Sequence, residues 1–357
     1  MRTCRLLTLI PIALALASGA RAAEWPHIAG QGTDWVNSLE GAQWPTIADG
    51  AAIAAETRIA EVERRYPKPF AFELGARYWY SSGTTKFGFS NGDPAFGDPT
   101  STLDWKGTQG QSGEVFGRVD HRPTSLFAKA TVGGGFLQNG TFIDRDFFAG
   151  QLSFSDTTSQ ISGNDLRYAT ADIGLSYEVP QYGARFSGFV GYHYWHEKTT
   201  AYGLVCNTTA VLQLFCGPPG FQRLSPDVTV MLYEPTWHAM RIGGEARLRL
   251  DRRWTLTGEV AIIPIAWLDN KDSHLLRSDL GTSPNILTSG YGWGGMAEVF
   301  VNYAITPQLE IGVGARYWGL TTYKGSVDFG PAFNPEYKLD NFDTSRYGVL
   351  AQIKGRF

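Results

Sequence analysis

The chain has 357 residues, of which 31 are Lys or Arg and 34 are Asp or Glu, so its formal net charge is −3. These charges are spread along the chain, whereas nucleic-acid binders carry a basic stripe, so we expect no nucleic-acid partner. Aromatic residues make up 13% of the chain and Gly numbers 42. Because disordered chains are rich in charge and poor in aromatics, we expect a folded protein.

The N-terminus has the features of a secretory signal peptide over residues 1–22. Arg2 and Arg5 precede the apolar run 6–17, and Ala20-Arg21-Ala22 forms a small-x-small cleavage site. The apolar run is shorter than the roughly 20 residues of a membrane-spanning helix, and no later stretch approaches that length. The sequence therefore predicts an exported protein without a transmembrane helix.

Residues 23–69 form an N-terminal extension with a different pattern. Trp25, Trp35 and Trp44 lie among Gly and polar residues, and residues 51–65 are rich in Ala with charges spaced as on a helix. A periplasmic extension, an insert in a barrel lumen and a partner-binding helix all fit this segment.

From Phe70 to Phe357 the chain alternates with a period of two residues. The last segment places Tyr347, Val349, Ala351 and Ile353 on one face and Arg346, Gln352, Lys354 and Arg356 on the other. Such segments reach ten residues or more, whereas strands of soluble proteins average five or six. Long strands with one apolar face, aromatic ends and a C-terminal Phe predict an all-β, antiparallel, transmembrane outer-membrane barrel. Ten segments begin near residues 70, 103, 124, 165, 185, 229, 254, 291, 308 and 343.

The connections between these segments alternate in length. Short ones lie near 120–124, 179–184, 251–253 and 305–307, and long ones near 82–102, 140–163, 203–228, 269–290 and 325–342. Outer-membrane barrels have short periplasmic turns and long extracellular loops. We therefore expect a bacterial outer-membrane location with the long loops facing the cell exterior.

The predicted inward face carries charges of both signs, including Glu114, Arg118, Glu245 and Arg316. A ten-stranded barrel is narrow and is filled by its side chains, whereas porins have about 16 strands. This argues against a diffusion pore. In one long loop, Cys206 and Cys216 flank a polar, Pro- and Gly-containing stretch, which suits a disulfide in an exported protein, with two unpaired thiols as the alternative.

Two short motifs lie in long loops at the same end of the predicted barrel. Asp144 and Asp146 are two residues apart, as are Asp272 and His274, so each pair shares one face of an extended chain. A carboxylate beside an imidazole stabilises its charged form and makes His274 a candidate base for a water molecule. Two crowded carboxylates raise one another's pKa and can share a proton. This combination predicts attack of water on an amide without a covalent enzyme intermediate.

These motifs resemble those of the omptins, ten-stranded outer-membrane proteases that pair a D-x-D in the second surface loop with a D-x-H in the fourth. Leu103-Asp104-Trp105-Lys106 is similar to the start of the second omptin strand, and Trp267 to the approach to the D-x-H loop. The resemblance implies an endopeptidase of the aspartic (omptin) type with Asp144, Asp146, Asp272 and His274 as catalytic residues. It also implies a peptide or protein substrate, contact with outer-membrane lipid, and dependence on lipopolysaccharide without any other cofactor.

The chain departs from the omptin pattern at positions that set specificity. Omptins that cut between basic residues carry a Glu late in the first strand and an Asp two positions before the catalytic Asp of the fourth loop. Here these positions hold Lys86 or Phe87, and Asn270, while Asp269 is acidic but one residue out of register. Asp269 and Asn270 are candidate substrate-binding residues, and cleavage beside basic residues is not expected.

Two other functions fit the sequence. One is a catalytically inactive omptin-like barrel that acts as a surface adhesin or a binding protein, and the other is an unrelated structural or narrow-transport barrel. No metal site is predicted, because His193 and His196 are three residues apart and therefore point to opposite faces of a strand.

Overall fold

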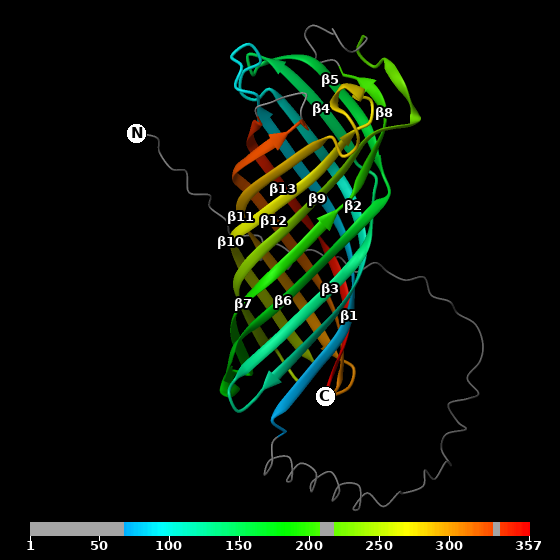
Figure 1. Ribbon diagram of the computed structural model, residues 1–357. Helices are drawn as coiled ribbons and strands as arrows, with labels where there is room; N and C mark the ends of the chain where they lie inside the picture. Colours follow the sequence, from blue (N-terminus) through cyan, green and yellow to red (C-terminus); the bar gives the residue numbers. More distant parts are fainter. Residues whose placement is uncertain (1–67, 208–217, 331–335) are drawn as a thin grey trace, which may run out of the picture. The chain divides into compact units, whose positions relative to one another are not determined.

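The structure is a computed structural model that describes residues 68–207, 218–330 and 336–357 (Figure 1). These residues form one antiparallel sheet of 13 strands. The strands are β1 (Phe70–Ser90), β2 (Ser101–His121), β3 (Leu126–Gln138), β4 (Thr141–Phe148), β5 (Leu152–Ser162), β6 (Asn164–Val179), β7 (Ala184–Glu197), β8 (Thr199–Cys206), β9 (Gln222–Arg249), β10 (Trp254–His274), β11 (Ile286–Ala304), β12 (Leu309–Asp328) and β13 (Tyr337–Arg356). Ten of them close a ring in the order β1-β13-β12-β11-β10-β9-β7-β6-β3-β2, and β2 pairs with β1. The predicted ten-stranded antiparallel barrel is confirmed.

The remaining strands, β4, β5 and β8, continue three strands of the ring after a bend. Asn139 and Gly140, both with positive φ, separate β3 from β4, Gly163 separates β5 from β6, and Lys198 separates β7 from β8. β2 pairs with β3 and then with β4, and β9 pairs with β7 and then with β8. The barrel therefore has ten strands at both levels. We call the level with β3, β6 and β7 the lower tier and the level with β4, β5 and β8 the upper tier.

The long connections are shorter than the sequence predicted, because strands continue into them. β1 extends to Ser90 and β10 to His274, and β4, β5 and β8 lie inside segments that we expected to be loops. On β10 the outward residues of this region are polar, as Asp269 and Lys271 show. The apolar alternation that marks a membrane strand therefore ends while the hydrogen-bonded pairing goes on.

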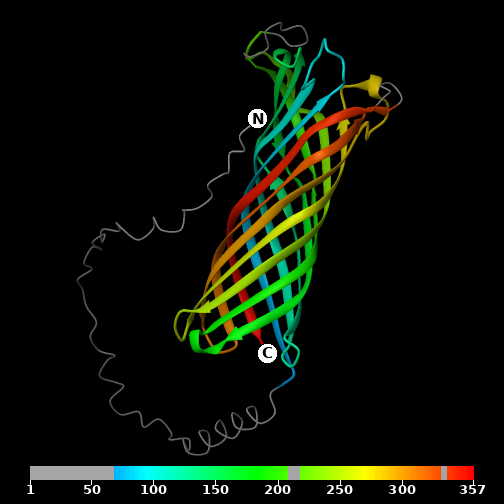
Figure 2. The same ribbon diagram turned by 90° about the vertical axis from the view of Figure 1, so that its left-hand side faces the viewer.

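The short connections lie where the sequence placed them, and one contains the 3₁₀ turn η1 (Pro180–Tyr182). They gather at the end of the barrel that also holds Phe357, which pairs with Phe72 (Figure 2). We call this the turn end and the opposite end the loop end. The signal peptide, the extension up to residue 67 and Cys216 lie outside the described residues. Within the described ranges, no helix is long and apolar enough to span a membrane.

An apolar belt surrounds the lower tier. Its outward side chains include Val115, Val132, Val260, Val313 and Val349, each at least 60% exposed. Exposed aromatic residues border it toward the loop end and toward the turn end: Tyr80, Tyr192, Trp267, Tyr291, Tyr317 and Tyr347 on the first side, and Phe70, Tyr177, Trp254 and Phe357 on the second. A polar interior with an apolar belt between aromatic girdles is the arrangement of an outer-membrane barrel.

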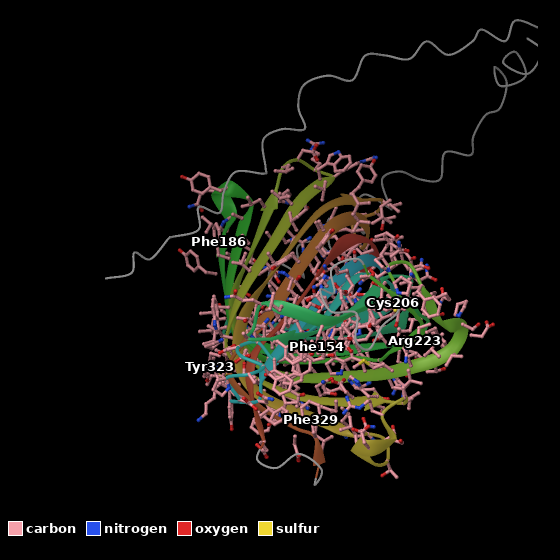
Figure 3. The ribbon with its side chains drawn as sticks, turned by 90° about the horizontal axis from the view of Figure 1, so that it is seen from above. Phe154, Phe186, Cys206, Arg223, Tyr323 and Phe329 are labelled. Carbon is pink, nitrogen blue, oxygen red and sulfur yellow. The ribbon has the colours of Figure 1, made fainter. Side chains whose placement is uncertain are left out.

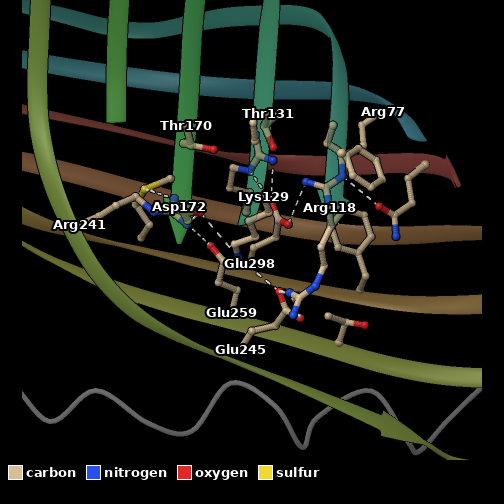
Figure 4. Close-up of a pocket in the computed structure, with 18 of the residues that line it drawn as sticks. Arg77, Arg118, Lys129, Thr131, Thr170, Asp172, Arg241, Glu245, Glu259 and Glu298 are labelled. Atoms are coloured by element: carbon tan, nitrogen blue, oxygen red, sulfur yellow. Dashed lines mark hydrogen bonds and ion pairs between the residues drawn. The ribbon is translucent and has the colours of Figure 1, made fainter. Parts of the chain in front are cut away.

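Ion pairs fill the lumen of the lower tier (Figure 4). Arg316 pairs with both Glu114 and Glu298, and Arg77 donates to Glu298 over 3.1 Å. Nearby, Lys129 pairs with Glu245 and Glu259. The space left among these side chains is a cavity of about 100 Å³. The predicted pairing of luminal charges is therefore present, and we call this set of ion pairs the luminal lattice.

Candidate active site

The D-x-D motif lies on β4 in the upper tier. Asp144 is paired with Leu103 of β2 and Asp146 with Ser101, so both carboxylates share the inward face with the buried Phe142. Loss of hydration at this position raises the pKa of Asp144 well above its usual range, and the negative charge of Asp146 raises it further. Burial also raises the pKa of Asp146, against a hydrogen bond from Ser101. Both shifts favour the protonated form of a carboxyl, so they agree in direction with a proton shared by the pair.

The D-x-H motif ends β10 on the opposite side of the upper tier. Asn270, Asp272 and His274 alternate on the inward face, and the side chains of Asn270 and Asp272 are fully buried. Asn285 fixes this strand end through two hydrogen bonds. Its side-chain oxygen accepts from the backbone N–H of His274 over 2.9 Å, and its backbone N–H donates to the backbone carbonyl of Asp272 over 3.0 Å. The motif is therefore held on a strand and not on a free loop.

Burial dominates the electrostatics of this motif. Burial raises the pKa of Asp272 to about 8. Burial, aided by the charge of Arg277, lowers the pKa of His274 to about 4. Among the described residues, neither the Asp272 carboxylate nor His274 Nε2 has a hydrogen-bond partner. Burial therefore favours the neutral form of His274, and the stabilisation of a charged imidazole by Asp272 stays a prediction.

Arg277 connects the two motifs. It follows β10, and its charge acts on Asp144, on Asp146 and on His274. Its guanidinium donates to Asp279 over 2.9 and 2.7 Å, within the segment that contains the 3₁₀ turn η2 (Ser278–Leu280). The two motifs therefore lie within the electrostatic reach of one side chain.

An aromatic stack joins the two walls in the upper tier. Phe142 on β4 contacts Trp105 on β2 with ring centroids 4.8 Å apart, and Trp105 stacks on Tyr233 of β9 at 3.9 Å. Tyr233 is the strand partner of Asp272, and Phe142 lies two residues before Asp144. These three rings, which we call the aromatic floor, hold the two motifs at the same level. Figure 3 looks into this end of the barrel, with Phe154 and Phe329 near the mouth.

The structure separates the two candidate substrate-binding residues. Asn270 faces inward, whereas Asp269 is exposed on the outer face of β10 and cannot line the site. Side chains alternate along a strand, so Asp269 takes the face opposite to Asn270 and Asp272. The same rule resolves the first strand, where Lys86 is exposed outward and Phe87 is buried inward.

Sequence reasoning missed Tyr233, Arg277 and Asn285. The alternation of side chains along β10 would have placed Asn270 inside and Asp269 outside, because residues 270 and 272 are two apart and share one face. Tyr233 and Asn285 could not be found this way, since their roles depend on strand register and on the path of the connection after β10. In the third long connection, Cys206 is disulfide-bonded, and its predicted partner Cys216 lies outside the described residues.

The sequence matches no protein-family model and no curated protein. Among solved structures, the chain is similar to the outer membrane protease OmpT from Escherichia coli, with a TM-score of 0.63 and 14% identity over 81% of this chain and 98% of that one. The translocator domain of the autotransporter NalP from Neisseria meningitidis gives a TM-score of 0.35 and 13% identity over 87% and 98%. Ail, the attachment invasion locus protein of Yersinia pestis, gives 0.27 and 9% over 80% and 98%. The first of these comparisons establishes a shared fold, that of an outer-membrane barrel.

Proposed function

We propose that this chain is an omptin-like outer-membrane endopeptidase that hydrolyses peptide bonds with an activated water molecule. One observation carries the proposal: Asp144 with Asp146, and Asp272 with His274, occupy two walls joined by the aromatic floor and lie within reach of Arg277. The fold shared with a protease of the outer membrane supports it.

The proposed reaction uses the protonation states that the site favours. Neutral His274 accepts a proton from water as the water oxygen attacks the carbonyl carbon of the substrate. Asp144 and Asp146 position this water and, through their shared proton, the developing oxyanion. The imidazolium then returns its proton to the leaving amide nitrogen, and the C–N bond breaks. Asp272, on the same face as His274, stabilises the imidazolium once the carboxyl has ionised.

The proposed location is the bacterial outer membrane, with the loop end facing the cell exterior. Short turns are periplasmic in this class of barrel, and the turn end here holds the short connections. Lipopolysaccharide is the proposed partner of the outer surface. An epitope inserted after Gly92, in the connection between β1 and β2, is expected to bind antibody on intact cells, whereas binding only after lysis would reverse the orientation.

The test refolds the mature protein in detergent, with and without lipopolysaccharide, and incubates it with a mixed peptide library. Fragments are read by mass spectrometry for wild type and for His274→Ala and Asp272→Asn. We expect cleavage by wild type that falls at least about 100-fold in His274→Ala, since a general base contributes about 10²–10⁴-fold. A gel-mobility assay for the folded barrel controls for misfolding. A folded wild type that cuts no peptide in either lipid condition would favour the adhesin or binding barrel instead.

A further inference from the structure

Tyr233 lies next to Asp272 on the inner wall of the upper tier. The two residues are partners across the β9–β10 pair, and both side chains are buried inside the barrel. Partners on one face of such a pair have Cβ atoms about 4.5–5.5 Å apart. Among the described residues, neither the Tyr233 hydroxyl nor either oxygen of the Asp272 carboxyl has a hydrogen-bond partner. A buried donor and a buried acceptor therefore occupy neighbouring positions, and each can satisfy the other.

The ring of Tyr233 packs against two others, which limits how its hydroxyl can turn. It stacks on Trp105 of β2 with ring centroids 3.9 Å apart and lies nearly parallel to Phe342 of β13 at 6.1 Å. Burial raises the pKa of Tyr233 well above its usual range, and the charge of Asp272 raises it further, while the Thr85 hydroxyl opposes this rise. The Tyr233 hydroxyl therefore stays protonated, and remains a donor, over the pH range in which Asp272 titrates.

A second carboxylate, Glu197 of β7, also acts on Tyr233, but it is already paired. Glu197 accepts from Nε of Arg346 over 3.0 Å, and its ion pair with the same guanidinium spans 2.9 Å. Asp272 has only the amide of Asn270 to favour its charged form, and burial outweighs that amide and raises the pKa of Asp272 to about 8. A hydrogen bond to an ionised carboxylate stabilises the charged form. Of the two carboxylates, Asp272 is the one that needs the donor.

We propose that the Tyr233 hydroxyl donates a hydrogen bond to Asp272 when this carboxyl ionises, and that Tyr233 is thereby a positioning residue of the proposed enzyme. The inference rests on the proposed function, in which ionised Asp272 stabilises the imidazolium of His274. Tyr233 acts through Asp272 and not on the substrate. Its hydrogen bond increases the fraction of molecules in which Asp272 is ionised at pH 7.

The experiment compares wild type with Tyr233→Phe, which removes the hydroxyl and keeps the ring of the aromatic floor. For one peptide that wild type cuts, kcat and KM are measured from pH 6 to 10, where His274, with a pKa of about 4, stays neutral. We expect the rise of kcat with pH to move up by about one unit, which lowers kcat at pH 7 about tenfold. KM should change less than twofold, and the two kcat values should converge near pH 10. An unshifted profile would overturn the inference.

Two controls assign the shift to the contact with Asp272. In an Asp272→Asn background, Tyr233→Phe should change kcat less than twofold at every pH, because the acceptor no longer ionises. Tyr323→Phe, on the exposed outer face of β12, is the matched control and should leave the pH profile unchanged. Because the Tyr233 hydroxyl has no hydrogen-bond partner among the described residues, its removal should not destabilise the barrel. An equal loss of kcat in the Asp272→Asn background would contradict the proposal.

A titration of Asp272 separates this inference from the proposed function. The full chain is refolded with ¹³C at the side-chain carboxyl of Asp, and NMR follows the signal that disappears in Asp272→Asn. The pKa of Asp272 should be about one unit higher in Tyr233→Phe than in wild type, whether or not a peptide is cut. This shift without cleavage would support the hydrogen bond and remove the protease. Cleavage by wild type with an unchanged pKa of Asp272 would support the protease and remove the role of Tyr233.

Discussion

The lumen of the lower tier and the candidate site in the upper tier differ in how their acidic side chains are paired. In the lumen of the lower tier, each of the carboxylates Glu73, Glu114, Glu259 and Glu310 has at least one ion pair with Lys or Arg. In the candidate site, Asp272 is fully buried but forms no ion pair with any of the described residues. Paired charges hold the barrel closed, whereas an unpaired carboxyl costs stability and is retained where chemistry needs it. The difference distinguishes residues that build the barrel from those that we expect to act on a substrate.

The largest expected effect comes from the D-x-D pair. Asp144→Asn and Asp146→Asn each remove one partner of the proposed shared proton, and we expect either change to lower kcat by about 10²-fold or more. Because the charge of Asp146 raises the pKa of Asp144, Asp146→Asn should also lower the pKa of Asp144. Kinetics at several pH values measure both effects. Full activity in either variant would mean that this pair has no catalytic role.

In the lower tier, Glu114→Gln tests the luminal lattice. Glu114 pairs with Arg316 and lies 3.7 Å from Arg77. Its neutral replacement therefore leaves two guanidinium groups inside the barrel without this negatively charged partner. Removal of one partner of a buried pair costs about 3–5 kcal/mol. We expect a lower free energy of unfolding in urea with peptide cleavage kept in the folded fraction. A loss of cleavage at unchanged stability would contradict the division between the tiers.

The pH dependence of cleavage gives a smaller effect with a defined sign. His274 has a lowered pKa of about 4, so it stays neutral and able to accept a proton as pH falls from 7 to about 5. Asp272 has a raised pKa of about 8, so it ionises and can stabilise an imidazolium only as pH rises through 8. We therefore expect a rate that rises up to about pH 9 and loses this rise in Asp272→Asn. A rate that peaks near pH 6 would contradict these protonation states.

The smallest effect is expected at the exposed end of the barrel. Lys338 lies 2.7 Å from Asp340 and 3.6 Å from Asp98, but its side chain is largely exposed. Exposed ion pairs contribute about 0–1 kcal/mol. Lys338→Gln should therefore change the free energy of unfolding by less than about 1 kcal/mol, measured in the same urea titration as Glu114→Gln. A change as large as that of Glu114→Gln would mean that burial does not determine how much an ion pair contributes to the free energy of unfolding.

The sequence predicts the barrel well because contact with lipid restricts which residues can face outward. Outward residues such as Val313 and Val349 must be apolar, and inward residues such as Arg316 must be paired, so period and strand count can be read from the chain. Above the belt water replaces lipid, and the outward residues Asp269 and Lys271 no longer mark a strand. Tyr233 and Arg277 enter the site through register and through the fold of a connection, neither of which has a local sequence signal.

The aromatic floor and the luminal lattice beneath it limit how a polypeptide can approach the candidate site. With a cavity of about 100 Å³ in the lower tier, no extended chain can be threaded through the barrel. If the proposed protease function holds, a substrate enters and its products leave at the loop end. A segment that enters and leaves as a bend fits this arrangement, so a protein substrate of the proposed enzyme would need neither a free terminus nor complete unfolding.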